Sequence, residues 1–182
     1  MKVKALTGIQ TVTNYKFGAD LERANSSELE VSRLLKNHYD TSTLKIGNDY
    51  KFDLLVKTKK DRELRLEIKE DFRVGKTGNF LLEFEFKGKP SGILKSKADY
   101  YIHILHMPTG LEYWSTSSSK LKQMIAEKLY FKIVEGGDGS RAGAKVTGIR
   151  DATITTKNYL FKLEVFKEHS KQLFIEKVKV EN

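Results

Sequence analysis

The sequence predicts one α/β domain, residues 1–182, in which helices flank a mixed β-sheet. An amphipathic segment over residues 20–38 has apolar side chains at helical spacing. Several short runs after it alternate apolar and polar residues, which is typical of strands with one buried face. A second helix is predicted over residues 117–128, where a run of serines supplies a capping residue. No proline-rich or serine-rich linker divides the chain, so one layered domain is favoured.

The first predicted helix directs a carboxylate inward. Leu21, Ala24, Val31 and Leu35 form its apolar stripe, and Glu28 lies on the same stripe. A carboxylate on an inward face requires a partner, and a metal ion is one such partner.

A hairpin is predicted next. Residues 50–57 form its first strand, residues 58–62 a charged turn, and residues 63–70 its second strand. A weaker extended run at residues 44–46 precedes it. The second strand alternates strictly, with one apolar face and one charged face: Leu64, Leu66 and Ile68 against Arg65, Glu67 and Lys69.

The later elements are predicted in the same way. Strands are expected over residues 80–86, 100–105, 112–114 and 159–166, and the tail from Lys167 is helical or extended. Residues 88–97 carry turn-forming and basic side chains. The glycine-rich segment 136–148 is expected to be a loop, and with Arg141, Lys145 and Arg150 it is placed to close over a phosphate backbone. It lacks the Gly-Lys-Ser/Thr ending of a nucleotide-binding loop.

Composition narrows the classes of function. The 33 Lys and Arg residues outnumber 24 Asp and Glu, and the net charge of +9 favours a polyanionic partner, nucleic acid before an anionic membrane. Since there is no cysteine, disulfides, thiolate zinc sites and cysteine nucleophiles are excluded. No segment has the apolar length of a signal peptide or a membrane-spanning helix. We therefore expect a soluble, cytoplasmic protein without a membrane partner.

Three residues of the hairpin carry the predicted chemistry. Glu67 and Lys69 share a face because they are two residues apart, and pairing through the turn brings Asp53 close to that face. Two carboxylates at a sheet edge bind a hard divalent ion such as Mg²⁺, with the Ile68 carbonyl as a third ligand. An ammonium beside carboxylates stays charged, so Lys69 is expected to position water or stabilise charge on a phosphate. The competing interpretation is an ordinary solvent-facing strand, in which Glu-x-Lys is common.

The arrangement resembles the PD-(D/E)XK nuclease superfamily, which includes restriction endonucleases, Holliday junction resolvases and phage recombination exonucleases. The resemblance covers residues 21–105. Asp53 matches the first acid of the family pattern, Glu67 the second and Lys69 the lysine, while Phe52 stands where the family name has proline. Several branches place a further acid on the first helix, and Glu28 matches that position. The resemblance implies a restriction-endonuclease-like fold.

Two further runs resemble phage and bacterial members of this group. They are Thr77-Gly78-Asn79-Phe80-Leu81-Leu82-Glu83, and Lys89-Pro90-Ser91-Gly92-Ile93 followed by Lys97-Ala98-Asp99-Tyr100. By this resemblance, Glu83 and Ser91 lie near the active site or contact substrate. Lys89 and Lys97, with the basic residues of the hairpin turn, are expected to form a surface that binds the nucleic-acid backbone.

The resemblance implies a Mg²⁺-dependent endodeoxyribonuclease in which Mn²⁺ can replace Mg²⁺. The partner is DNA, a structure-selective enzyme such as a junction resolvase fits the small size, and a homodimer is compatible with it. One alternative is a restriction endonuclease or exonuclease of the same superfamily. Another is a nucleic-acid-binding protein without catalysis, and a third is a structural virion or interaction protein whose charge is incidental. A metal-binding role for His103 and His106 is disfavoured, because three-residue spacing on a strand turns them to opposite sides.

Overall fold

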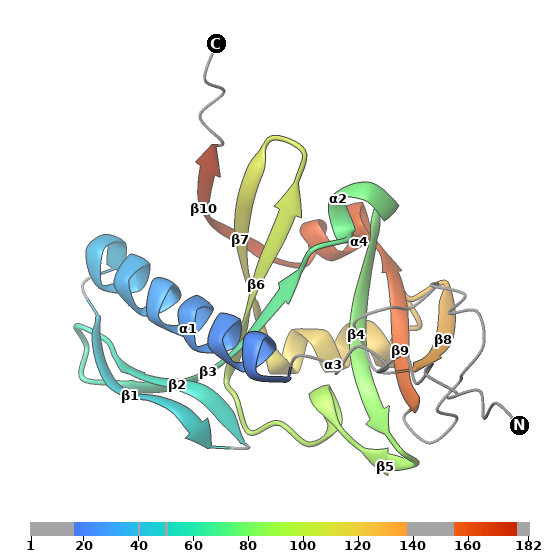
Figure 1. Ribbon diagram of the computed structural model, residues 1–182, viewed down its shortest axis with the longest axis horizontal. Helices are drawn as coiled ribbons and strands as arrows, with labels where there is room; N and C mark the ends of the chain where they lie inside the picture. Colours follow the sequence, from blue (N-terminus) through green and yellow to red (C-terminus); the bar gives the residue numbers. More distant parts are fainter. Residues whose placement is uncertain (1–16, 40, 50, 138–154, 178–182) are drawn as a thin grey trace, which may run out of the picture.

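Two β-sheets and one long helix form three layers in the computed structural model, which describes residues 17–39, 41–49, 51–137 and 155–177. Helix α1 covers one face of a six-stranded sheet, and a four-stranded sheet lies beyond the other face (Figure 1). The elements in chain order are α1 (Phe17–Tyr39), β1 (Ser42–Asp49), β2 (Phe52–Lys57), β3 (Glu63–Asp71), α2 (Val74–Thr77), β4 (Asn79–Phe86), β5 (Lys89–Pro90), the 3₁₀ turn η1 (Gly92–Leu94), β6 (Tyr100–Met107), β7 (Gly110–Ser117), α3 (Ser118–Ala126), β8 (Lys132–Gly137), β9 (Thr155–Lys162), α4 (Leu163–Glu168) and β10 (Lys171–Lys177).

The six-stranded sheet is mixed, as the sequence predicts. Its order is β1-β2-β3-β6-β7-β10, with β3 and β6 parallel and the other neighbours antiparallel. The chain leaves this sheet after β3, passes through α2, β4, β5 and η1, and returns as β6. The coarse prediction of a mixed sheet with flanking helices is therefore confirmed.

The predicted hairpin of β2 and β3 is present, but its ladder is short. The pairs run from Lys57 opposite Glu63 to Leu54 opposite Leu66. Beyond Leu66, the pairing of β3 continues only on its other edge, with β6, as far as Asp71. One edge of β3 is thus uncovered by β2 from Glu67 onward, and this gap lies beside the start of β2.

Two apolar clusters hold the layers together. Val31, Leu34 and Leu35 of α1 pack with Leu54 and Ile68 on one face of the six-stranded sheet. The alternation of β3 and the helical spacing of α1 explain this packing, because each presents one apolar face to the other. The second cluster joins the opposite face to β4, β9, α3 and α4. The side chains of Leu21 and Ala24 lie outside the described part of the chain.

The helix predicted over residues 117–128 is α3 (Ser118–Ala126), and its predicted serine cap is observed. The Ser117 hydroxyl accepts a hydrogen bond from the Lys120 amide at 3.1 Å. Leu121 and Met124 are fully buried on its inner side. A serine cap followed by an amphipathic turn therefore marks this helix correctly.

The prediction for the C-terminal part is partly wrong. The strand expected over residues 159–166 is β9, which begins earlier and ends at Lys162, and α4 follows it. Leu163 and Phe166 are both buried and stand three residues apart, as on a helix. The alternating spacing of buried residues that marks a strand therefore ends before Leu163. The tail from Lys167 includes the strand β10, which pairs with β7.

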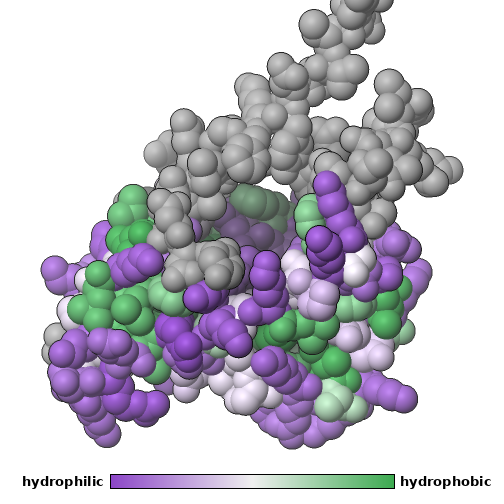
Figure 2. All heavy atoms as spheres, turned by 90° about the horizontal axis from the view of Figure 1, so that it is seen from below, coloured by the Kyte–Doolittle hydropathy of each residue, from purple (hydrophilic) through white to green (hydrophobic). Residues whose placement is uncertain are grey.

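The surface seen from below is mostly hydrophilic (Figure 2). Hydrophobic side chains form several separate patches on this face. In the described ranges, no helix is long and apolar enough to cross a membrane.

Candidate functional site

The charged face of β3 meets the start of β2 where the ladder ends. Leu66 and Ile68 pack against the α1 side, so alternation places Glu67 and Lys69 on the opposite face. Their side chains form an ion pair of 2.7 Å between Lys69 Nζ and Glu67 Oε1. Asp53 accepts a 2.7 Å hydrogen bond from the Ile68 amide. The structure therefore brings Asp53 and the Glu67–Lys69 pair together, as the hairpin predicts.

Glu28 belongs to the same group of charges. Glu28 is 8% exposed, and its Oε2 atom is buried with no hydrogen-bond partner among the described residues. Burial raises the pKa of Glu28, the charge of Asp53 raises it further, and Lys69 opposes both. A buried, unpartnered carboxylate oxygen is costly, which makes this position suited to a ligand.

Three carboxylates share one lysine at this site. Burial and the charge of Glu67 raise the pKa of Asp53, against the opposing effects of Lys69 and the Ile68 amide. Crowding by surrounding atoms lowers the pKa of Lys69 although its side chain is about half exposed, and attraction to Glu67 and Asp53 outweighs this effect, so the net pKa is raised. Lys69 is therefore a cation at neutral pH, and the cluster retains excess negative potential. We refer to Glu28, Asp53, Glu67 and Lys69 as the acidic cluster.

The donor chemistry of the acidic cluster suits a hard divalent cation. Carboxylate oxygens are the ligands that Mg²⁺ prefers. The Ile68 amide points toward Asp53, and the amide and carbonyl of one strand residue face the same side, so the Ile68 carbonyl also faces the end of β2. In the described part of the chain, however, no three Asp, Glu, His or Cys side chains stand close enough to hold a metal. The Glu67 oxygens are engaged by Lys69 and Ser96, so binding an ion requires them to exchange partners.

Ser96 is a site residue that the sequence does not reveal. Its hydroxyl lies 3.3 Å from Glu67 Oε2 and 3.4 Å from the Lys51 carbonyl, and donates to one or the other. The Lys97 amide also donates to the Lys51 carbonyl. The segment before β6 is thereby tied both to Glu67 and to the residues that precede Asp53.

Two buried polar side chains lie beside the cluster on β6. Tyr101 pairs in register with Glu67, and His103 pairs with Lys69. They are 1% and 2% exposed, and neither Tyr101 Oη nor His103 Nε2 has a hydrogen-bond partner in the described residues. Burial raises the pKa of Tyr101 to about 12, and burial together with the charge of Lys69 lowers the pKa of His103 to about 3. Both are neutral at neutral pH.

The two histidines diverge, as their spacing predicts. His103 packs with its ring edge-on to Phe80 and Phe166 in the second cluster. The His106 Nε2 atom lies 2.6 Å from Glu70 Oε1, and Ser27 donates to the other oxygen of Glu70. Neither histidine shares a ligand set with the acidic cluster.

Glu83 and Ser91 contact each other. The Ser91 hydroxyl donates to Glu83 Oε1 at 2.5 Å, and the Ser91 amide donates to the Phe84 carbonyl. Gly92 follows at φ +46°, where an added Cβ would lie 2.2 Å from the Glu83 carbonyl oxygen. Glycine is thus required at this turn. The Ser-Gly-Ile run closes β4 against η1, and no interaction of Glu83 or Ser91 reaches Asp53 or Glu67.

The residues of the predicted basic surface lie at the hairpin turn, on β5 and in the segment before β6. Lys59, Lys60 and Arg62 are exposed at the turn, and Lys57 is paired with Asp61 at 2.6 Å. Lys89 and Lys97 are also exposed. In the glycine-rich segment, Gly136 and Gly137 end β8. Arg141, Lys145 and Arg150 lie outside the described residues.

Comparison of the chain with family models, curated proteins and solved structures finds no match.

Proposed function

We propose that this protein is a Mg²⁺-dependent endodeoxyribonuclease with a PD-(D/E)XK-like site. The observation that carries the proposal is the acidic cluster at the point where the β2–β3 ladder ends. Three carboxylates from two strands and a helix meet one lysine there, and the pKa values of Glu28 and Asp53 are raised by burial and by their neighbours. Carboxylates with perturbed pKa values and an unpartnered oxygen are more typical of functional sites than of structural ion pairs.

The acidic cluster supplies the residues that would hold the ion. Asp53 and Glu67 are the proposed ligands, with the Ile68 carbonyl beside them and the unpartnered oxygen of Glu28 as a further donor. Mn²⁺ accepts the same oxygen ligands as Mg²⁺ and is expected to replace it. A bound divalent ion supplies positive charge at the phosphate and acidifies water for in-line attack.

Lys69 acts as a cation in this proposal. Its raised pKa disfavours a role as general base at neutral pH. When Glu67 is engaged elsewhere, the ammonium is available to a phosphate oxygen, where it stabilises the charge that builds up during hydrolysis. Ser96 positions Glu67 through its hydroxyl.

The charge of the molecule supports DNA as substrate. The net charge is +9, and Lys59, Lys60 and Arg62 are exposed at the hairpin turn that leads to the acidic cluster. A structure-selective enzyme of the junction-resolvase kind, acting as a homodimer inside the cell, is the form of the proposal that the family resemblance favours. A restriction endonuclease or exonuclease would use the same cluster.

A specific observation favours a second candidate, a nucleic-acid-binding protein without catalysis. Glu67 is already neutralised by Lys69, and the described carboxylates do not form a ready ligand set. This candidate keeps the basic surface and has no use for the acidic cluster.

A cleavage assay separates the two candidates. Wild type, Glu67→Gln and Lys69→Met are incubated with linear duplex, single-stranded and four-way-junction DNA in Mg²⁺ or Mn²⁺. Cutting by wild type that both variants lose, with unchanged folding and DNA binding, supports the nuclease, and the preferred substrate selects among the enzyme classes. If wild type cuts no substrate with either ion and all three proteins bind DNA equally, the binding protein replaces it.

A further inference from the structure

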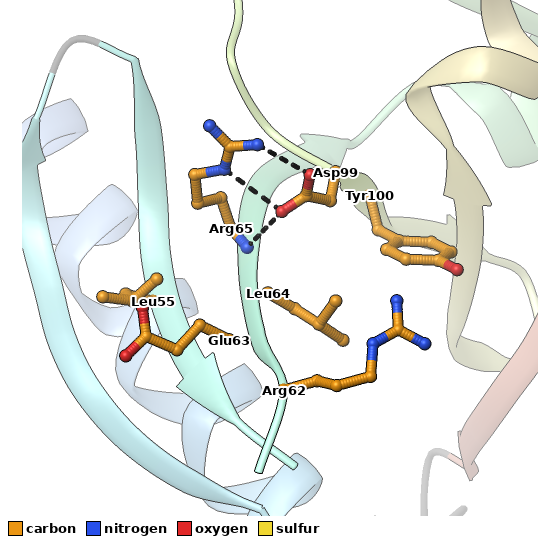
Figure 3. A pocket seen from close by; sticks show the side chains of 7 residues that line it. All are labelled: Leu55, Arg62, Glu63, Leu64, Arg65, Asp99 and Tyr100. Atoms are coloured by element: carbon orange, nitrogen blue, oxygen red, sulfur yellow. Dashed lines mark hydrogen bonds and ion pairs between the residues drawn. The ribbon is translucent and has the colours of Figure 1, made fainter. Parts of the chain in front are cut away.

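Two adjoining depressions lie next to the acidic cluster. The first has a volume of about 430 Å³, and Arg62, Leu64, Arg65, Asp99 and Tyr100 are among its lining residues (Figure 3). The second, of about 280 Å³, shares Arg62, Leu64 and Tyr100 with the first and adds Tyr39, Lys59 and Lys60. The two depressions adjoin at these three shared residues, and we refer to them together as the tyrosine groove.

The sequence register places the tyrosine groove beside the proposed cutting site. Arg65 precedes Glu67 by two residues on the same strand and face, a separation of roughly 7 Å. Leu55, which also lines the first depression, stands in the same relation to Asp53 on β2. The groove thus begins two residues along β2 and β3 from Asp53 and Glu67, and it extends to Tyr39 at the end of α1.

The charges of the groove suit a polyanion. Arg65 is held by Asp99, which accepts from its backbone amide and from two guanidinium nitrogens (Figure 3). Arg62 lies across Leu64 from this pair and makes no side-chain hydrogen bond to the described residues. The lining includes four cations, with Lys59 and Lys60, against the two carboxylates of Glu63 and Asp99. The lining therefore has two more positive than negative side chains, and Arg62 and Lys60 are exposed.

The aromatic residues of the groove point to single-stranded substrate. Tyr39 is 38% exposed and Tyr100 is 36% exposed, so each ring offers surface to a ligand. Cations interleaved with exposed aromatic rings are the recurring design of single-strand sites, in which bases stack on the rings while phosphates follow the cations. A duplex keeps its base faces stacked internally and presents none to the tyrosines.

We propose that the tyrosine groove binds a single-stranded segment of the nucleic-acid substrate, with phosphates at Arg62 and Lys60 and bases against Tyr100 and Tyr39. This inference rests on the proposed function, because it names the form in which substrate reaches the acidic cluster. It implies that the enzyme acts on substrates with an unpaired strand beside the cut.

The test measures binding, so it does not depend on cleavage. All proteins carry Glu67→Gln, and the affinity for short fluorescent single-stranded DNA, single-stranded RNA and duplex DNA is measured by anisotropy in EDTA at several salt concentrations. The groove variants are Arg62→Gln, Tyr100→Leu and Tyr39→Leu. Lys132→Gln is the matched control, because Lys132 is exposed on β8 of the other sheet and its loss removes the same charge.

The groove variants have distinct expected results. Tyr100→Leu weakens binding of the single strand about tenfold and leaves duplex binding within about twofold. Arg62→Gln lowers the slope of log affinity against log salt by about 0.7 on the single strand. Lys132→Gln changes neither, and the DNA and RNA arms show which sugar the groove prefers.

Groove variants that match Lys132→Gln on every single strand would overturn the inference, even if wild type cuts DNA. An equal loss on duplex and single strand would also overturn it, because the site would then read only phosphate charge. If the binding results are as expected but wild type cuts no DNA, single-strand binding by the groove would be supported and the proposed nuclease activity would be contradicted.

Discussion

Two groups of charged side chains meet the same face of β3. One is the Arg65–Asp99 ion pair, and the other is the acidic cluster, which begins two residues further along at Glu67. They differ in the balance of charges and in the direction in which their carboxyl pKa values are shifted. Arg65 and Asp99 are matched one to one. Asp99 accepts three hydrogen bonds from Arg65, and these bonds hold the pKa of the Asp99 carboxyl below its ordinary value despite partial burial. In the acidic cluster, one lysine faces three carboxylates, and the pKa values of Glu28 and Asp53 are raised.

The Arg65–Asp99 pair therefore stabilises the folded state, whereas the ionised carboxylates of the acidic cluster destabilise it. The Arg65–Asp99 pair satisfies its own charges and joins β3 to the segment before β6. The acidic cluster retains carboxylates that raise one another's pKa and a buried oxygen without a partner in the described residues. Functional sites commonly carry such a cost in stability, which binding of the proper ligand removes.

The largest expected difference is in catalysis. Glu67→Gln removes one proposed ligand charge and is expected to lower kcat by about a thousandfold, since the ion contributes several kcal/mol to the transition state. Asp99→Asn weakens the bonds to Arg65 in the tyrosine groove but leaves the proposed ligands in place, so it is expected to lower kcat at saturating DNA by less than about tenfold. Single-turnover cleavage of the best substrate measures both. Equal losses in the two variants would remove the distinction between the groups.

The second difference is in the sign of the effect on stability. Glu28→Gln is expected to raise the free energy of unfolding by about 1 kcal/mol without divalent ions, because a neutral amide is cheaper to bury beside two carboxylates. Asp99→Asn is expected to lower it by about 1 kcal/mol through its weakened bonds to Arg65. Each change corresponds to a melting shift of about 3 °C. Calorimetry at pH 7 checks the two signs, and destabilisation by Glu28→Gln would contradict the account.

The third difference is in pH dependence. The raised pKa means that folded Asp53 binds its proton more tightly than the unfolded chain, whose value is near 3.8. The free energy of unfolding therefore falls as pH rises from the unfolded pKa of Asp53 to its folded pKa. Above the folded pKa, ionised Asp53 continues to destabilise the fold. Asp53→Asn, which keeps an acceptor for the Ile68 amide, is expected to gain most over wild type at pH 7. The gain shrinks toward about pH 4, and urea unfolding across this range measures it.

The control for this pH series is Asp99→Asn. The pKa of Asp99 is lowered, so its stabilisation is present at neutral pH and is lost as pH falls through the folded value. The variant is expected to be less stable than wild type at pH 7 and to approach it in acid. Curves of the same sign for both variants would show that the two sites are electrostatically alike.

The smallest difference concerns two buried tyrosines. The hydroxyl of Tyr101 beside the acidic cluster has no partner in the described residues, whereas Tyr113 donates a 2.6 Å hydrogen bond to Glu30. Tyr101→Phe is expected to change stability by less than about 0.5 kcal/mol, and Tyr113→Phe to cost about 1.5 kcal/mol. Denaturant unfolding distinguishes these values, and a large loss in Tyr101→Phe would reveal a partner.

The local part of the site was predictable from sequence. Period-two alternation places Glu67 and Lys69 on one face of β3, and the short turn sets Asp53 close to them. Helical spacing marks Glu28 as inward-facing, and its burial confirms that orientation. The helix cap at Ser117 also follows from local pattern and is confirmed.

Non-local pairing accounts for what the sequence does not reveal. Tyr101 and His103 lie beside the cluster because β6 pairs parallel to β3, after a return of the chain that no local pattern specifies. Ser96 reaches Glu67 for the same reason. The Ser-Gly-Ile run has a structural role that the resemblance does not reveal, through the bond between Ser91 and Glu83 and the clash that a Cβ at Gly92 would cause. Contact of Glu83 or Ser91 with substrate stays a prediction.

Calorimetric titration of Mn²⁺ and Mg²⁺ into wild type, Asp53→Asn and Asp99→Asn tests the central claim most directly. If the acidic cluster is a cation site, wild type and Asp99→Asn bind one ion with equal affinity, and Asp53→Asn loses at least about tenfold in affinity. Absence of binding to wild type, or equal binding to all three proteins, would contradict the claim that the acidic cluster holds a divalent ion.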